Sequence, residues 1–166
     1  MVTTALQATS ALVLALPAHA QPAPNARPVG GTVVGGAASI SRTAGDTQIN
    51  QSSQRAAIDW QSFNVGAKQS VTFNQPSSSA VALNRVTGPD PSQIAGRIDA
   101  NGQIVLVNQS GVTFYRGAQV NAAGVMVSTA DVANKNFMAG TMKFDQPGSP
   151  NARIDNRGSI TVREAG

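Results

Sequence analysis

One short motif recurs along the chain and constrains its fold more than any other feature: an aliphatic residue, Asp or Asn, two variable positions, glycine, and a second aliphatic run. Asp and Asn side chains bond the local backbone in turns, and glycine adopts the positive φ that such turns need. The motif therefore predicts strand-turn-strand units. Its copies lie at residues 97–104 (RIDANGQI), 120–126 (VNAAGVM), 153–160 (RIDNRGSI) and, in part, 107–112 (VNQSGV).

The spacing of these units favours a parallel β-solenoid. Ile98 and Val120, which begin two of the copies, are 22 residues apart, and a period of about twenty residues is what one coil needs. The next interval, to Ile154, is 34 residues and predicts a loop between coils around residues 135–151. Antiparallel hairpins use the same Asn-Gly turns, so a hairpin sandwich stays open as the alternative.

The rest of the sequence is typical of an all-β chain. From Gly30 onward, short β-branched or apolar runs alternate with turn residues. Only residues 128–139 (STADVANKNFMA) fit a helical turn or two. Residues 30–46 are expected to cap one end of the solenoid, because an open end exposes unpaired strand edges. The strands are expected at residues 71–73, 80–83, 103–107, 112–114 and 125–127.

The residue types that are missing exclude most enzyme chemistry. The chain has no cysteine, and its only histidine, His19, lies in a segment that we expect to be removed. Without imidazole or thiol there is no Ser-His-Asp or Cys-His catalysis, no metal site with nitrogen or sulfur ligands, and no disulfide. The acidic residues number only eight. Asp99 and Asp155 are interpreted as occupying equivalent turn sites, and turn hydrogen bonds explain both. We therefore predict no enzyme and no catalytic, cofactor-binding or metal-binding residue.

The net charge of +4 does not indicate a nucleic-acid partner. The twelve Lys and Arg residues are scattered singly, without a basic run or interleaved aromatic residues. They are expected to be solvated surface charges, and no nucleic-acid binding is predicted.

The N-terminus has the features of a secretory signal peptide. An apolar stretch at residues 11–16 is followed by Pro17 and then by Ala18 and Ala20, small residues at the positions that signal peptidase requires. Cleavage is predicted after Ala20, and the mature chain is expected to be secreted. A buried N-terminal helix is the alternative, although the proline-rich residues that follow could not continue it. The predicted parts are a signal peptide at 1–20, a linker at 21–29 and one domain at 30–166.

Eight short motifs follow one another in order between residues 60 and 131. They are WQSFNVG at 60–66, VTFNQP at 71–76, ALNRVTG at 82–88, DPSQIAG at 90–96, NGQIVLVN at 101–108, GVTF at 111–114, GAQVN at 117–121 and VSTAD at 127–131. In this order they resemble the secretion domain of two-partner-secretion exoproteins of the filamentous haemagglutinin type, also called the haemagglutination activity domain. The similarity begins near residue 31 and continues more weakly to the end of the chain.

The resemblance implies a right-handed, single-stranded parallel β-helix, a pectin-lyase-like solenoid with an N-terminal cap and small antiparallel extensions. It implies as partner an outer-membrane β-barrel transporter with POTRA domains, which reads the domain in the periplasm of a Gram-negative bacterium. It also implies that the domain nucleates folding of a longer β-helical passenger, an adhesin or haemagglutinin that contacts host cells or glycans at the cell surface. The domain itself is expected to be a monomer without a cofactor.

The resemblance also marks a candidate recognition turn. The family's Asn-Pro-Asn-Gly-Ile segment falls on Asn108, Gln109, Ser110, Gly111 and Val112. Gln109 and Ser110 replace the family's Pro-Asn pair. Loss of the proline removes a fixed φ, so this turn is expected to be looser than in the family.

A second candidate lies in the Asn84-Arg85-Val86 motif. Arg85 is predicted either to contact the transporter or to form a structural ion pair. Trp60 could stack on a sugar, but it is expected to be a packing anchor, because no second exposed aromatic residue is near in sequence.

Two other functional classes stay open. A stand-alone surface protein that binds a ligand or glycan fits the same fold, although the predicted removal of His19 argues against axial haem ligation. A carbohydrate-active β-helix lyase is less favoured, because it needs clustered carboxylates or a basic residue in a cleft. The last strand, at residues 160–164, has no capping signal, so the chain is expected to be either the front of a longer exoprotein or a truncated gene product.

Overall fold

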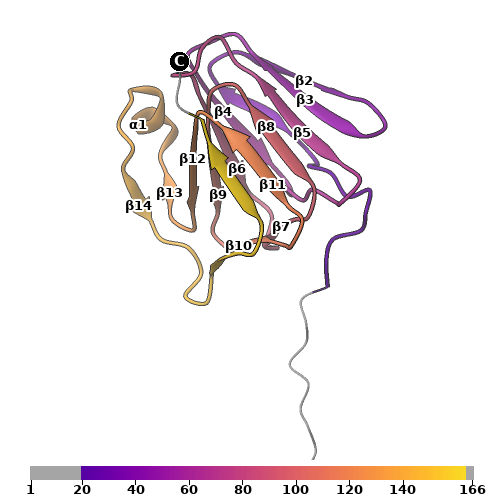
Figure 1. Cartoon of the computed structure of the whole chain (residues 1–166). Helices are drawn as coiled ribbons and strands as arrows, with labels where there is room; N and C mark the ends of the chain where they lie inside the picture. Colours follow the sequence, from indigo (N-terminus) through magenta and orange to yellow (C-terminus); the bar gives the residue numbers. More distant parts are fainter. Residues whose placement is uncertain (1–19, 164–166) are drawn as a thin grey trace, which may run out of the picture.

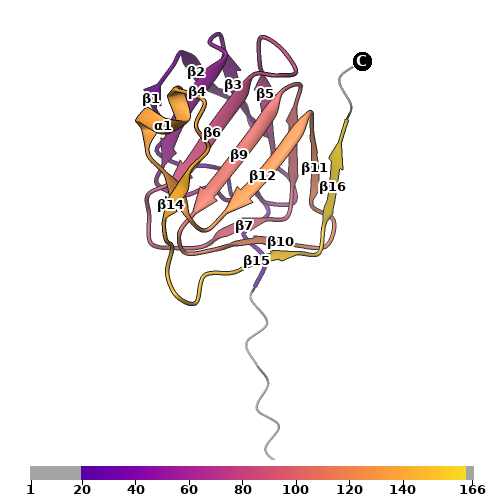
Figure 2. The same ribbon diagram turned by 90° about the vertical axis from the view of Figure 1, so that its left-hand side faces the viewer.

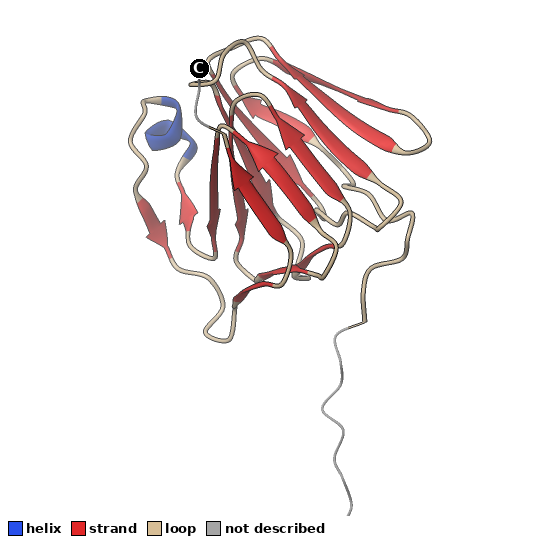
Figure 3. Cartoon of the chain, viewed as in Figure 1, coloured by secondary structure: helices blue, strands red, loops and turns tan. Residues whose placement is uncertain are grey.

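The chain winds into a short coil of β-strands with three faces (Figures 1 and 2). This computed structural model describes residues 20–163. Nearly all of its regular structure is strand, with one short helix beside the coil (Figure 3). The predicted signal peptide lies outside the described residues, apart from Ala20.

Three sheets form the faces, and parallel pairing dominates each of them. The five-strand face has, in spatial order, β1 (Thr32–Gly35), β4 (Arg55–Trp60), β6 (Val81–Val86), β9 (Gln103–Asn108) and β12 (Gly124–Ser128). The six-strand face has β2 (Ala38–Arg42), β3 (Asp46–Gln51), β5 (Ser70–Asn74), β8 (Arg97–Ala100), β11 (Gln119–Ala122) and β16 (Ser159–Val162). The three-strand face has β7 (Ser92–Ile94), β10 (Val112–Phe114) and β15 (Ile154–Asn156). This arrangement confirms the predicted parallel β-helix, and the hairpin sandwich is wrong.

The register confirms one predicted coil length and corrects another. Ile98 in β8 and Val120 in β11 are direct partners, as the 22-residue spacing predicts. The next partner of Val120 is Ile160 in β16, whereas Ile154 pairs with Val112 on the three-strand face. The copy at 153–160 therefore marks a different corner of the coil, because every corner uses the same turn chemistry. Asp99 and Asp155 are for this reason not equivalent, contrary to the sequence-based interpretation.

The N-terminal part of the domain runs backwards along the first coil and pairs with it on every face. β2 pairs antiparallel with β3, and β1 pairs antiparallel with β4. Residues 24–29, here called the cap segment, run antiparallel to residues 62–68 beside the three-strand face. This reversed coil covers the strand edges at one end, which confirms the expected cap.

The cap segment overlaps the stretch in which a linker was expected. The Lys68 amide donates to the Pro24 carbonyl at 2.9 Å, and the Gly66 amide donates to the Ala26 carbonyl at 2.8 Å. A β-carbon at Gly66 would lie 2.2 Å from the Ala23 carbonyl oxygen, so only glycine permits this approach. Prolines cannot donate, but their carbonyls still accept, and this is how a proline-rich segment pairs with a coil edge.

The interior of the coil is apolar along its whole length. Trp60 and Phe63, both buried, pack edge to face with ring centroids 5.5 Å apart near the capped end. The other large buried side chains inside the coil include Ile49, Ile58, Val65, Val71, Phe73, Ile94, Val112 and Phe114. Burial of this continuous core is the main stabilising term, since the chain has no disulfide.

A second apolar core lies outside the coil. Between β12 and β15 the chain leaves the coil as β13 (Asp131–Val132), α1 (Asn134–Met138) and β14 (Phe144–Gln146), here called the excursion. Val132 and Phe137 of the excursion pack on the outer surface of the five-strand face. β6 and β9 are therefore buried on both sides, which explains the apolar runs at residues 81–83 and 104–107. The helix and the excursion lie where a helical turn and an inter-coil loop were predicted.

Candidate recognition surface

Asn84, in the middle of β6, points into the interior of the coil. Its side chain is 2% exposed, and its Oδ1 accepts a hydrogen bond from Nε1 of Trp60 at 3.1 Å. Its Nδ2 donates to the Ala82 carbonyl at 3.3 Å. Asn84 thus supplies the acceptor that a buried indole needs. Trp60 is a packing anchor, as the sequence predicted.

Arg85, the next residue, points outward and holds the excursion. Its Nε lies 2.8 Å from both carboxylate oxygens of Asp131, and its Nη1 lies 2.9 Å from Asp59. Nη1 also donates to Asn134 Oδ1 at 2.7 Å, and Nη2 donates to the Val132 carbonyl at 2.6 Å. Burial alone would lower the pKa of Arg85, but the hydrogen bonds and charges of Asp131 and Asp59 raise it above its usual value. All three guanidinium nitrogens of Arg85 hydrogen-bond to other residues of the chain. This favours the structural ion pair over a partner contact.

The turn between β9 and β10 is built around Asn108. This side chain is 1% exposed, and its Nδ2 donates to the Asp90 carbonyl and to Ser92 Oγ, both at 3.0 Å. Its Oδ1 accepts from the Ser110 amide at 2.9 Å, which closes an Asx turn. Gly111, at φ +114°, donates its amide to the Asn108 carbonyl at 3.0 Å. The hydrogen bonds of this motif are therefore local and structural.

The two residues that replace the family's Pro-Asn pair also hold the turn. Ser110 Oγ donates to the Pro89 carbonyl at 2.6 Å. Gln109 Nε2 donates to the Pro147 carbonyl at 3.0 Å and to the Gln146 carbonyl at 3.3 Å. These side chains supply contacts that a proline lacks, and the expectation of a looser turn stays a prediction. Val112, the last residue of the motif, is fully buried in the core.

The structure brings the two candidate motifs to the same end of the five-strand face. Val86, which follows Arg85, is the register partner of Asn108. Two shallow grooves flank this end. One, of about 320 Å³, is lined by Arg85 and the excursion, including Gln146. The other, of about 360 Å³, runs beneath the turn over the outer surface of the three-strand face; it is lined by Pro91, Gln93, Ser110, Gly111, Val112, Thr113, Tyr115, Asn151 and Arg153. Sequence reasoning missed Arg153, because its approach to the turn depends on the length of the excursion.

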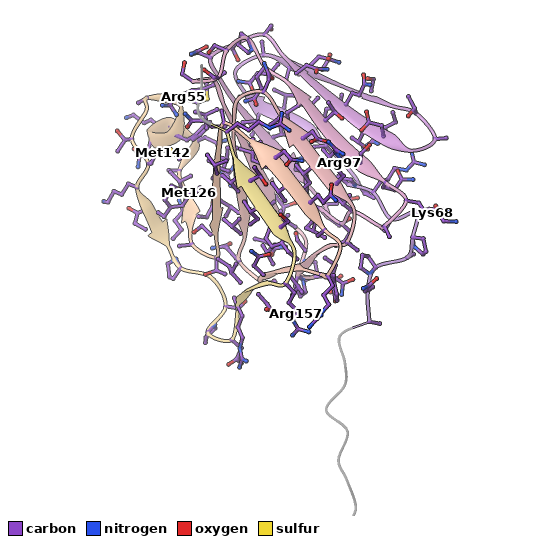
Figure 4. The ribbon with its side chains drawn as sticks, viewed as in Figure 1. Arg55, Lys68, Arg97, Met126, Met142 and Arg157 are labelled. Carbon is purple, nitrogen blue, oxygen red and sulfur yellow. The ribbon has the colours of Figure 1, made fainter. Side chains whose placement is uncertain are left out.

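The outer surface of the six-strand face carries rows of polar side chains that bond from one coil to the next. Asp99 accepts a hydrogen bond from Asn121 on the next coil at 3.0 Å and pairs with Arg97, which Figure 4 places on this face. Burial raises the pKa of Asp99, but hydrogen bonds from Arg97 and Asn121 lower it below its usual value overall. Asp155 pairs instead with exposed Arg157 at 2.8 Å. Neither carboxylate belongs to a ligand set.

Between residues 20 and 163 there is no group of three or more His, Cys, Asp or Glu side chains that could hold a metal ion. In the same part of the chain, the helices are too short and too polar to cross a membrane. Ala20, at the predicted cleavage site, is exposed, and its carbonyl accepts a hydrogen bond from the Tyr115 hydroxyl at 3.1 Å. Ala18, the other predicted cleavage residue, lies outside the described residues.

Comparison with known proteins agrees with this geometry. The family model of the TPS secretion domain matches residues 25–166. Two heme/hemopexin-binding proteins of Haemophilus influenzae are 42% identical over 105 residues and 45% identical over 98 residues. These alignments cover 63% and 58% of this chain but only 12% and 11% of the relatives, so the chain corresponds to a small part of them.

A solved structure, the HMW1 secretion domain from Haemophilus influenzae, superposes with a TM-score of 0.75 at 36% sequence identity. The match covers 81% of this chain and 36% of that one. Exoproteins with such a domain are secreted across the Gram-negative outer membrane with a cognate transporter. The chain belongs to the TPS secretion domain family, the secretion domains of two-partner-secreted exoproteins.

Proposed function

We propose that this chain is the N-terminal secretion-targeting domain of an exoprotein of the adhesin or haemagglutinin type. A cognate outer-membrane β-barrel with POTRA domains recognises it in the periplasm, and the domain then nucleates β-helix folding at the cell surface. Family membership over residues 25–166 is the observation that carries the proposal. No catalytic role is part of it.

The two ends of the coil support a nucleating role. The reversed N-terminal coil pairs antiparallel with the edges of the first coil, so no further parallel coil can stack on the first coil from that end. At the other end, β12, β15 and β16 have no partner on their far edges among the described residues. Unpaired parallel edges accept a further coil, and a solenoid grows by such stacking. The cap thus gives folding a single direction.

Export requires the predicted N-terminal signal. We propose that residues 1–20 direct the chain to the periplasm and that the mature protein is secreted or held at the cell surface. Because the chain has no cysteine, no disulfide can lock its fold before it passes through the barrel. The receptor of the complete exoprotein, on host cells or glycans, is a property of the longer passenger.

A stand-alone ligand-binding role is the second candidate, because the two relatives are described as heme/hemopexin-binding proteins. The described residues of this chain contain neither histidine nor cysteine, the commonest protein ligands of haem iron. The grooves are also lined largely by polar side chains. These features favour secretion targeting over haem binding in this segment.

The test is an export assay in a Gram-negative host that produces the full chain with or without the cognate transporter. Extracellular protein is expected only when the transporter is present, with periplasmic accumulation or degradation when it is absent. Equal extracellular amounts in both hosts would overturn the proposal. Haem titration of the purified chain, followed by visible absorbance, tests the second candidate.

A further inference from the structure

We propose that the groove beneath the 108–111 turn receives an acidic side chain, Asp or Glu, from the periplasmic part of the transporter, and that Arg153 is its charge partner. This inference rests on the proposed function and names the surface and the chemistry by which recognition occurs. It also assigns the turn motif a role: the motif shapes the groove, although most of its own atoms are buried.

The turn and Arg153 are in direct backbone contact. The Val112 amide donates to the Arg153 carbonyl at 2.9 Å. A β-carbon on Gly111 would lie 2.7 Å from the same carbonyl oxygen, so a side chain there would push Arg153 away. The glycine of the motif is therefore needed for its positive φ and for the position of Arg153 at the groove.

The floor of the groove is the outer surface of the three-strand face. Thr113 on β10 and Gln93 on β7 are register partners. Both side chains point outward, because the residues on either side of each are buried: Val112 and Phe114 beside Thr113, and Ser92 and Ile94 beside Gln93. Asn151 and Arg153, on the chain returning from the excursion, form the rim and are exposed. The groove thus places the Arg153 guanidinium beside the uncharged side chains of Gln93, Thr113 and Asn151, and Ser110 and Tyr115 also line it.

The side chains of Gln93, Thr113, Asn151 and Arg153 have unused hydrogen-bonding capacity. None of their polar atoms has a hydrogen-bond partner among residues 20–163, and no carboxylate in that range lies within 4.0 Å of Arg153. Five carboxylates are already occupied by other cations; they are Asp59, Asp131, Asp99, Asp145 and Asp155. A planar guanidinium beside amide and hydroxyl donors suits a carboxylate, which accepts several hydrogen bonds at once.

The shape of the groove favours a carboxylate that belongs to a protein. The rim is exposed and the floor half-buried, so a free small anion would remain largely in water. An exposed ion pair contributes only about 0–1 kcal/mol, too little to hold such an anion at low concentration. A carboxylate carried on a larger interface is positioned by the other contacts of that interface, and the net charge of +4 attracts acidic partners.

The test compares two charge reversals, Arg153→Glu and Lys135→Glu, in the full chain. Both lower the net charge by two, but Lys135 is an exposed residue of α1 outside the groove. Binding to the purified full-length transporter in detergent is measured at about 50 and 300 mM NaCl, since exposed charge pairs are screened by salt. Arg153→Glu is expected to weaken binding by about tenfold or more at low salt and less at high salt. Lys135→Glu is expected to stay within about twofold of wild type.

A reversed partner completes the test. Replacing one periplasmic acidic residue of the transporter with Lys should restore binding of Arg153→Glu. Unchanged Trp60 fluorescence should show that each variant is folded. Equal weakening by both reversals, or wild-type binding by Arg153→Glu, would overturn the groove assignment. If export stays transporter-dependent in that case, the proposed function survives and only this inference fails. If sodium acetate shifts the Thr113 and Arg153 NMR signals while Arg153→Glu binds normally, the groove binds free carboxylates only, which also overturns the proposal.

Discussion

Replacing Arg85 with Met tests whether this motif residue acts through the fold. The substitution keeps an unbranched stem and removes the guanidinium that Asp131 and Asp59 surround. The Arg85 and Asp131 side chains are each 13% exposed, so Asp131 would be left buried without its counter-charge. Removing one partner of a buried pair typically costs about 3–5 kcal/mol. Because Asp59 is 30% exposed, it is partly solvated and adds little to that cost.

Urea unfolding followed by Trp60 fluorescence measures this loss. The matched control is Arg97→Met, since Arg97 is 53% exposed and pairs with Asp99 at the surface. The control is expected to change the free energy of unfolding by less than about 1 kcal/mol. The double variant Arg85→Met with Asp131→Leu should be more stable than Arg85→Met alone, because no buried charge is then unpaired.

Export of the double variant separates the two roles of Arg85. If Arg85 only holds the excursion, the double variant should be exported in proportion to its recovered stability. Stable protein that is still not exported would show that the transporter reads Arg85 itself. Arg85→Met with the stability of the Arg97 control would refute the structural reasoning.

Three further predictions concern other parts of the coil. Asn84→Leu leaves the buried indole nitrogen of Trp60 without its acceptor and should cost about 1–3 kcal/mol, measured as a lower urea midpoint; an unchanged midpoint would contradict the pairing. Gly66→Ala should displace the cap segment and lower the free energy of unfolding by about 1–3 kcal/mol, with faster proteolysis before β1. The control is Gly45→Ala, whose β-carbon would meet nothing closer than 3.8 Å, and it should behave like wild type. The pKa of Asp99 is lowered in the fold, so its stabilising contribution is present near neutral pH and is lost as the pH falls through that lowered value. Asp99→Asn should therefore lose less thermal stability than wild type on acidification below about pH 4, and identical acid profiles would count against this assignment.

The sequence was sufficient for the class of fold, because the turn motif and the strand signals both reflect local chemistry. Asn and Gly at the corners, with β-branched residues between them, are required wherever a coil turns. Because these signals are local, they also led to the wrong register for one copy of the motif. The copy at 153–160 has the right turn residues, but its position on the coil depends on the excursion that precedes it. No local pattern indicates how many residues leave the coil and return.

The candidate site was less predictable for the same reason. Arg85 meets Asp131 across 46 positions of sequence, and this contact exists only because the excursion folds back on the five-strand face. Arg153 reaches the 108–111 turn by the same route. A linker was expected where the cap segment lies, because its prolines suggest an unpaired chain, although proline carbonyls accept hydrogen bonds as well as others do. The sequence identified the motif at 108–112, and the structure showed the groove that this motif lines.

We propose that this domain directs export through a cognate transporter that recognises it in the periplasm. The most direct measurement is the amount of the chain outside cells that carry either the intact transporter or a transporter whose barrel inserts normally but whose periplasmic domains are deleted. Extracellular chain is expected only with the intact transporter, and the deletion is expected to leave folded or degraded chain in the periplasm. Equal extracellular amounts from the two strains would contradict the proposal.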